Sequence, residues 1–137
     1  MRITAEDRTF LERFTACETP KEEFRHADHV RLAWLLLAEA PLLPALPRFR
    51  TLLKAFAARH GATGLYNETI TCFYMLLIAE AMQGMDPHHG WEGFRAAQPG
   101  LFGYPQALLE RYYPAGLAFS PAAKASFLLP EGAPRAA

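Results

Sequence analysis

Two histidines have a spacing that could support chemistry. His26 and His29 stand three residues apart near the head of the apolar stretch Phe24–Leu37. Helical residues three apart have Cβ atoms roughly 5–6 Å apart, so two imidazoles there could share one proton or one ion. Imidazole is also the side chain best suited to acid–base catalysis near neutral pH. The spacing predicts a catalytic pair or two metal ligands, and two helix-capping or bridging histidines are the structural alternative.

A second polar segment, Tyr66–Thr71 (Y-N-E-T-I-T), opens another strongly apolar stretch. Its glutamate, Glu68, could orient an imidazole or act as a base, so the predicted catalytic residues are His26, His29 and Glu68. Glu68 could also be an ordinary first-turn acid, which the helix dipole favours. The predicted ligand-binding residues are Tyr66, Asn67, Thr71 and Arg31.

A metal site is a further interpretation of the same residues. Zinc or iron could bind the imidazoles of His26 and His29 and the Glu68 carboxylate, and some coordination positions of the metal would stay open. The pattern is not the H-E-x-x-H motif of zinc proteases. A di-iron bundle needs two E-x-x-H helices, and Glu23–His26 supplies one. A mononuclear metal is therefore an interpretation that we do not favour, and the cofactor stays unknown.

Apolar residues recur at helical spacing, and no stretch shows the sustained alternation of a strand. Thr4 with Asp7 predicts a capped first helix, and Thr19-Pro20 predicts a second start. The further predicted helices cover about 27–40, 47–60, 66–83, 86–97, 104–112 and 120–127. The chain is thus predicted to be all-α, with four main antiparallel helices (about 1–84), a helical appendage (about 85–128) and a tail (129–137) in one domain.

The helix at 27–40 carries both histidines on its apolar side. On a helical wheel, Asp28, Arg31 and Leu35 fall outside that apolar arc, and Arg31 is expected in solvent or paired with Asp28. Asn67 and Thr71 fall inside the apolar arc of the helix at 66–83.

Successive helices that alternate in direction would make the second and fourth helices parallel. Their N-terminal ends would then meet, together with His60 at the end of the third helix. This topology predicts a polar pocket at one end of the bundle. The two helix N-termini would attract an anion there.

Composition narrows the classes of partner. The chain has 14 Lys and Arg residues and 14 Asp and Glu residues, so its formal net charge is zero. This balance gives no electrostatic reason to expect nucleic acid or an anionic membrane as a partner. The longest apolar runs, Leu32–Ala38 and Cys72–Ala79, are far shorter than the roughly 20 residues of a membrane span. The N-terminus lacks the apolar core of a signal peptide, and the two cysteines form no C-x-x-C pair. We expect a cytoplasmic protein, and its low net charge favours a homo-oligomer.

The motifs resemble those of a family of small uncharacterised bacterial helical proteins. The matching segments are F-R-H-A-D-H-V-R-L-A-W (Phe24–Trp34), Y-N-E-T-I-T (Tyr66–Thr71), Tyr112-Tyr113, Ser120 and Phe127–Pro130. The resemblance implies a helical bundle. The family typically has histidine where this chain has Asn67, and the loss of a third imidazole favours a ligand pocket over a metal site.

The function predicted from the sequence is binding of a small, anionic molecule in a pocket at one bundle end. Catalysis by His26 and His29 with Glu68 would be an extension of that function. The alternative is a non-enzymatic interaction protein that dimerises through an apolar helix face. These readings differ in whether the two rings and the carboxylate converge on a cavity.

Overall fold

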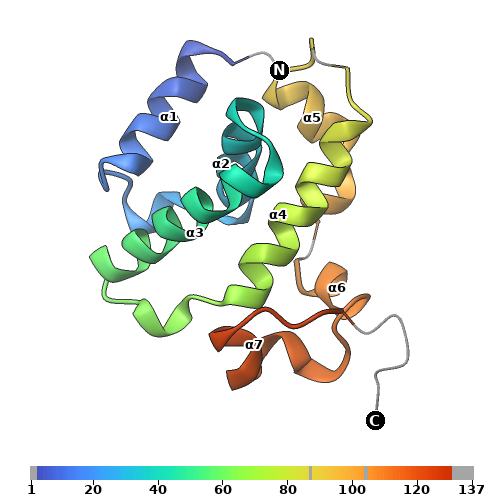
Figure 1. Ribbon diagram of the computed structural model, residues 1–137. Coiled ribbons are helices and arrows are strands. Elements are labelled where there is room, and N and C mark those ends of the chain that lie inside the picture. The colour runs from blue at the N-terminus through green and yellow to red at the C-terminus, as the bar shows by residue number, and fades with distance from the viewer. Residues whose placement is uncertain (1–2, 87, 104, 131–137) are drawn as a thin grey trace.

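The computed structural model describes residues 3–86, 88–103 and 105–130, and all regular structure among them is helical (Figure 1). The α-helices are α1 (Ala5–Thr15), α2 (His26–Glu39), α3 (Leu42–Arg59), α4 (Glu68–Gln83), α5 (Trp91–Ala97), α6 (Pro105–Glu110) and α7 (Pro121–Ala125). Four 3₁₀ turns join them: η1 (Lys21–Glu23), η2 (Thr63–Leu65), η3 (Pro99–Leu101) and η4 (Pro114–Phe119). The prediction of an all-α fold is confirmed.

The start of α1 follows the predicted cap. The Thr4 hydroxyl accepts a hydrogen bond from the Asp7 amide at 3.1 Å, and the Asp7 carboxylate accepts one from the Thr4 amide at 2.9 Å. This reciprocal pair satisfies two amides that a helix start leaves without partners. The second predicted start, at Thr19-Pro20, gives only the turn η1, because the extended backbone at Arg25 delays α2 until His26.

Two helix starts differ from the predictions. The third helix begins at Leu42 and not at Pro47. Pro44 is its third residue, where the amide needs no partner within the helix, and Pro47 removes a later bond without ending the helix. The fifth helix begins at Trp91 and not at Asp86, because the Asp86 carboxylate accepts a bond from the His88 amide at 2.8 Å and holds a turn. Pro87 and Tyr104, which the predictions included, lie outside the described residues.

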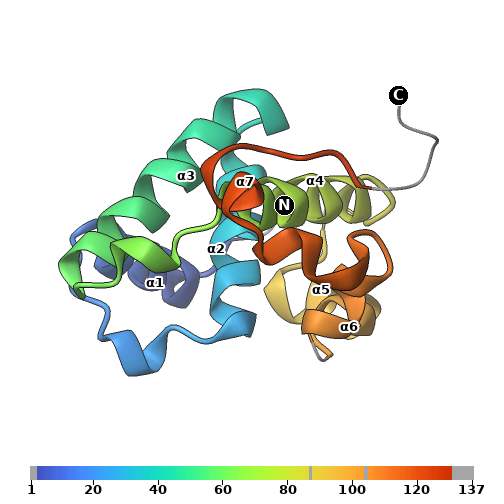
Figure 2. The ribbon, with the colours of Figure 1, turned by 90° about the horizontal axis from the view of Figure 1, so that it is seen from below.

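Helix α2 is the centre of the core. It lies between α1 and α4 and also packs against α3 (Figures 1 and 2). Its fully buried residues are Val30, Leu32, Ala33, Trp34, Leu35 and Leu36. Leu35 was expected outside the apolar arc, but it is buried because α2 is packed on several sides, by α1, α3 and α4. Helix α5 covers α2 as well, since the Trp34 and Trp91 ring centroids lie 5.7 Å apart.

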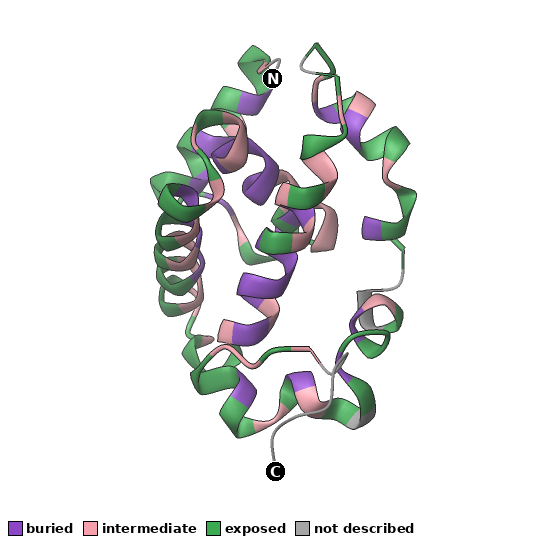
Figure 3. Cartoon of the chain, turned by 45° about the vertical axis from the view of Figure 1, so that its right-hand side comes forward, coloured by how far each residue is buried: buried purple, intermediate pink, exposed green. Residues whose placement is uncertain are grey.

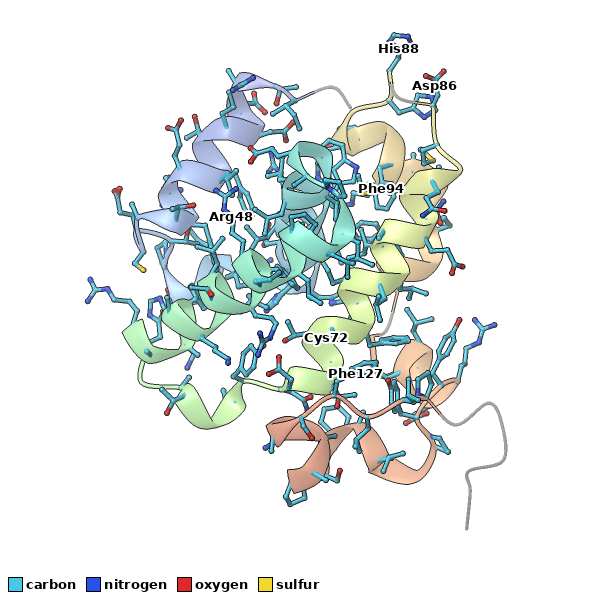
Figure 4. The ribbon with its side chains drawn as sticks, viewed as in Figure 1. Arg48, Cys72, Asp86, His88, Phe94 and Phe127 are labelled. Atoms are coloured by element: carbon cyan, nitrogen blue, oxygen red, sulfur yellow. The ribbon has the colours of Figure 1, made fainter. Side chains whose placement is uncertain are left out.

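The appendage packs against α4, much of which is buried (Figure 3). Residues 126–130 form a C-terminal strap over the start of α4, where Phe127 appears below Cys72 (Figure 4). The Thr69 hydroxyl donates to the Ser126 carbonyl at 2.9 Å and accepts from the Leu128 amide at 3.0 Å. Tyr113, buried with its ring 5.5 Å from Phe73, confirms that the Tyr112-Tyr113 pair packs the appendage on the bundle.

Within the described residues, no helix combines the length and the apolar character needed to cross a membrane.

Candidate functional site

A pocket of about 680 Å³ lies where the starts of α2 and α4 meet the second half of α3. This is the junction that alternating helix directions predicted. The apolar and aromatic lining residues are Phe24, Val30, Phe49, Leu53, Phe56, Ala57, Ala62, Leu65, Tyr66, Ile70, Tyr74, Ile78, Leu109 and Phe119. The last two show that α6 and η4, both in the appendage, complete the wall.

The polar part of the lining is small and consists of basic and neutral side chains. It consists of Lys21, His26, His29, His60, Asn67 and Thr71. None of the described residues that line the pocket is an aspartate or a glutamate. The pocket is therefore apolar with a few basic and neutral polar groups, the usual composition of a small-molecule site.

Each of the three histidines bonds to a backbone carbonyl. His26 Nε2 lies 2.8 Å from the Leu101 oxygen, and His29 Nδ1 lies 3.1 Å from the Arg25 oxygen. His60 Nε2 lies 3.2 Å from the Thr19 oxygen. A carbonyl oxygen can only accept, so the nitrogen in each contact carries the proton. In the neutral ring, the other nitrogen keeps its lone pair, which could accept a proton or a ligand's hydrogen bond.

The surroundings of His29 favour the neutral form of its ring. Burial lowers its pKa, and the nearby His26 acts in the same direction, whereas the Arg25 carbonyl and Asp28 oppose them. The ring packs against Phe24 with centroids 4.0 Å apart, yet its surface stays accessible because it faces the pocket. His29 is thus a ring that lines the pocket and has a lowered pKa.

Glu68 does not join the histidines. Its carboxylate accepts two bonds from Arg50, at 2.5 and 2.7 Å, and one from the Tyr66 hydroxyl at 2.8 Å. The bonds to Arg50 lower the pKa of Glu68, burial opposes them, and the Tyr66 bond adds to the lowering. Burial and the bond to Glu68 raise the pKa of Tyr66 to about 12. Glu68 lies in the first turn of α4 and binds Arg50 of α3. Its carboxylate therefore does not lie with the rings of His26 and His29, where it had been expected.

Asn67 lines the pocket but its amide is largely occupied. Its side-chain oxygen accepts from the Ile70 amide at 3.0 Å and caps α4, and its nitrogen donates to the Ala118 carbonyl at 2.7 Å. Both Asn67 and Thr71 are buried, as their place on the apolar arc predicted. Asn67 therefore shapes the pocket by joining the start of α4 to η4, and Thr71 is a polar lining residue.

Arg31 lies away from the pocket. Its guanidinium donates to the Asp7 carboxylate at 2.7 Å and sits 4.7 Å from the centroid of the Phe10 ring. The expected partner was Asp28, but that carboxylate accepts the Arg25 amide at 3.0 Å at the start of α2. Arg31 thus ties α2 to α1 and is not among the residues that line this pocket, so its role in ligand binding stays a prediction.

The residues proposed as metal ligands do not form a donor set. Among the described residues, no three His, Cys, Asp or Glu side chains are grouped so that they could hold a metal ion. The third ligand, Glu68, is the one taken up by Arg50. The site thus lacks the geometry that zinc or iron would need.

Lys21 and His60 line the pocket but were not among the predicted catalytic, ligand-binding or metal-binding residues. Lys21 belongs to a segment that was read only as a helix start, and Leu109 and Phe119 come from an appendage with no predicted contact to the site. His60 was expected near the site from topology, and that signal could have placed it among the candidates.

Comparison with protein-family models, curated proteins and solved structures finds no match. The family resemblance of the two motifs stays a prediction.

Proposed function

We propose that this protein binds a small, largely apolar molecule in the pocket between α2, α3 and α4. The observation that carries the proposal is the pocket itself, about 680 Å³ in volume with mainly apolar and aromatic walls. Pockets that bury drug-sized ligands commonly measure about 300–1,000 Å³ and combine apolar walls with a few polar groups. The lone pairs that carbonyl contacts leave on the three imidazoles could orient a bound molecule.

The test uses a neutral fluorescent probe, N-phenyl-1-naphthylamine. Ala57 lines the pocket, whereas Ala55 is exposed on the same helix. We expect saturable one-to-one binding that raises the melting temperature, because a ligand that binds only the folded state stabilises it by about 2.7 kcal/mol at 100 times its Kd. Ala57→Phe should weaken binding at least tenfold, and the matched control Ala55→Phe should not.

Absence of saturable binding to the unmodified protein would reject this function. Equal affinities for the Ala57→Phe and Ala55→Phe variants would also reject the pocket as the binding site.

Acid–base catalysis by His26 and His29 is a second candidate. Its support is that both rings line the pocket, that a carbonyl orients each of them, and that burial lowers the pKa of His29, which favours the unprotonated form that a general base needs. Such positioned groups typically contribute about 10²–10⁴-fold to a rate. Turnover of p-nitrophenyl octanoate should fall by that order in His29→Gln while N-phenyl-1-naphthylamine still binds. Unchanged turnover in His29→Gln would exclude His29 as the base.

The alternative function is that of a non-enzymatic interaction protein that dimerises through an apolar helix face. A homo-oligomer is also expected from the low net charge. Sedimentation equilibrium measures it directly. A monomer at all concentrations would reject both.

A further inference from the structure

We infer that the ligand of this pocket carries a single carboxylate on an apolar body. The inference rests on the proposed binding function and adds the chemical class of the ligand. Four lining side chains can carry a positive charge: Lys21, His26, His29 and His60. Within the described part of the chain, the same lining includes no aspartate or glutamate, so a bound carboxylate would meet basic groups there and no acidic one.

Three acidic residues in the segments that supply the pocket lining already have partners. Glu68 is paired with Arg50, and Asp28 accepts the Arg25 amide. Glu23, in the same turn as Lys21, lies 3.5 Å from Arg13 on the surface. Lys54 adds another positive charge nearby, with its ammonium 5.1 Å from the centroid of the Tyr66 ring. A negatively charged ligand would therefore bring a counter-charge to Lys21 of the pocket lining.

The rings of His29 and His60 lie beside one pair of phenylalanines, whereas His26 packs against Tyr74 with ring centroids 5.3 Å apart. Two histidines flank a pair of phenylalanines, with centroid distances of 4.0 Å (His29–Phe24), 4.8 Å (Phe24–Phe56) and 4.5 Å (Phe56–His60). Lys21 precedes Phe24 in the same short segment, and its carbonyl accepts the Phe24 amide. Helices α4 and α6 supply apolar wall through residues that include Ile70, Ile78 and Leu109. This division suits a molecule with one charged end.

A carboxylate fits these groups better than a phosphate does. Arginine is favoured where a phosphate is bound by two parallel bonds from one planar group, and none of the described residues that line this pocket is an arginine. A doubly charged group would also cost more to move from water into apolar surroundings than a singly charged one. Lys21 supplies one permanent positive charge to the lining, which matches a single negative charge on the ligand.

The test compares octanoate, octanol and octylamine, which share a chain and differ in the head group. We expect isothermal titration calorimetry at pH 6.5 to show octanoate binding at least tenfold more tightly than octanol, and octylamine more weakly than either. The double substitution Lys21→Met with His60→Gln should remove the preference for octanoate and leave octanol binding unchanged. Lys124→Met, on α7 outside the pocket lining, is the matched control and should keep the preference.

The outcomes separate this inference from the proposed function. Octanol or octylamine binding as tightly as octanoate would overturn the carboxylate assignment, and so would a preference that survives in the double variant. In both cases N-phenyl-1-naphthylamine binding would still support the pocket. Failure of the neutral probe to bind would instead remove the proposed function on which the inference rests.

Discussion

Glu68 has the residue type of a catalytic base, yet its contacts are those of a structural ion pair. Its side chain is 13% exposed, and it holds Arg50 of α3 and the Tyr66 hydroxyl just before α4. Burial opposes a charged group unless partners compensate, and here two guanidinium bonds do so. The network joins α3 to α4 beside the pocket, so Glu68 contributes to the site by fixing its walls.

The first prediction concerns Glu68→Gln. Because the folded state lowers the pKa of Glu68 from its ordinary value of 4.5, the pair stabilises the fold fully above that value. That contribution is lost as the pH falls from 4.5 through the lowered folded pKa. We expect the variant to lose about 1–3 kcal/mol of unfolding free energy at pH 7, the usual worth of hydrogen bonds to a charged group. The difference from the unmodified protein should shrink at pH 3–4, as measured by urea unfolding.

The matched control is Glu39→Gln. Glu39 pairs with Arg48 at 3.0 Å, but both side chains are 47% exposed, and exposed pairs contribute about 0–1 kcal/mol. We expect less than half the effect of Glu68→Gln at pH 7. Equal effects at the two positions, or a Glu68→Gln difference that does not change with pH, would contradict the structural role assigned to Glu68.

At the scale of elements, Thr69 holds the C-terminal strap on α4. Its single hydroxyl bonds to both Ser126 and Leu128, so one side chain satisfies two backbone groups from the other end of the chain. Thr69 itself is fully buried. The strap, α7 and η4 are continuous in sequence, so this contact helps to keep Phe119 at the wall of the pocket.

The second prediction is that Thr69→Val releases the strap. Valine keeps the shape of threonine but leaves the Ser126 carbonyl and the Leu128 amide without this partner, at about 1–3 kcal/mol for each buried unsatisfied group. We expect a loss of that order in unfolding free energy and faster hydrogen exchange at the Leu128 amide. Thr9→Val on the exposed side of α1 is the control and should change neither quantity. Unchanged exchange at Leu128 would contradict the contact.

The helices themselves were predictable where the signal is local. Helical periodicity and the Thr4–Asp7 cap depend on residues within one or two turns of each other. The start of α3 was missed because Pro47 was read as a helix start, whereas the helix begins earlier and tolerates the proline. The short helices end earlier than predicted: α6 ends at Glu110 and not at Tyr112, and α7 ends at Ala125 and not at Phe127.

The site was predictable only in part, because its residues come together through topology. Alternating helix directions correctly brought His26 and His29 next to Asn67 and Thr71. The partners of Glu68 and Arg31 lie 18 and 24 residues away, on other helices, and no local pattern marks such pairs. Several candidate partners with similar charge compete for each side chain, and tertiary packing decides among them.

The whole molecule depends on contacts between the four main helices and the appendage. Trp34 of α2 packs against Trp91 of α5, and Phe73 of α4 packs against Tyr113. The pocket draws its wall from both regions. A chain divided near residue 84 would leave these apolar surfaces uncovered, so we expect the two regions to fold as one unit.

The third prediction follows from this unit: the protein should unfold in a single transition. The chain has two tryptophans, so Trp91→Phe leaves Trp34 to report on α2, and Trp34→Phe leaves Trp91 to report on α5. In each variant, the urea midpoint from tryptophan fluorescence should coincide with the midpoint from circular dichroism at 222 nm, as two-state unfolding requires. Both midpoints are measured on the same variant, so any stability lost through the tryptophan substitution affects them equally. A Trp91 transition that precedes the loss of helix would show that the appendage unfolds separately, and the pocket would then open before the bundle melts.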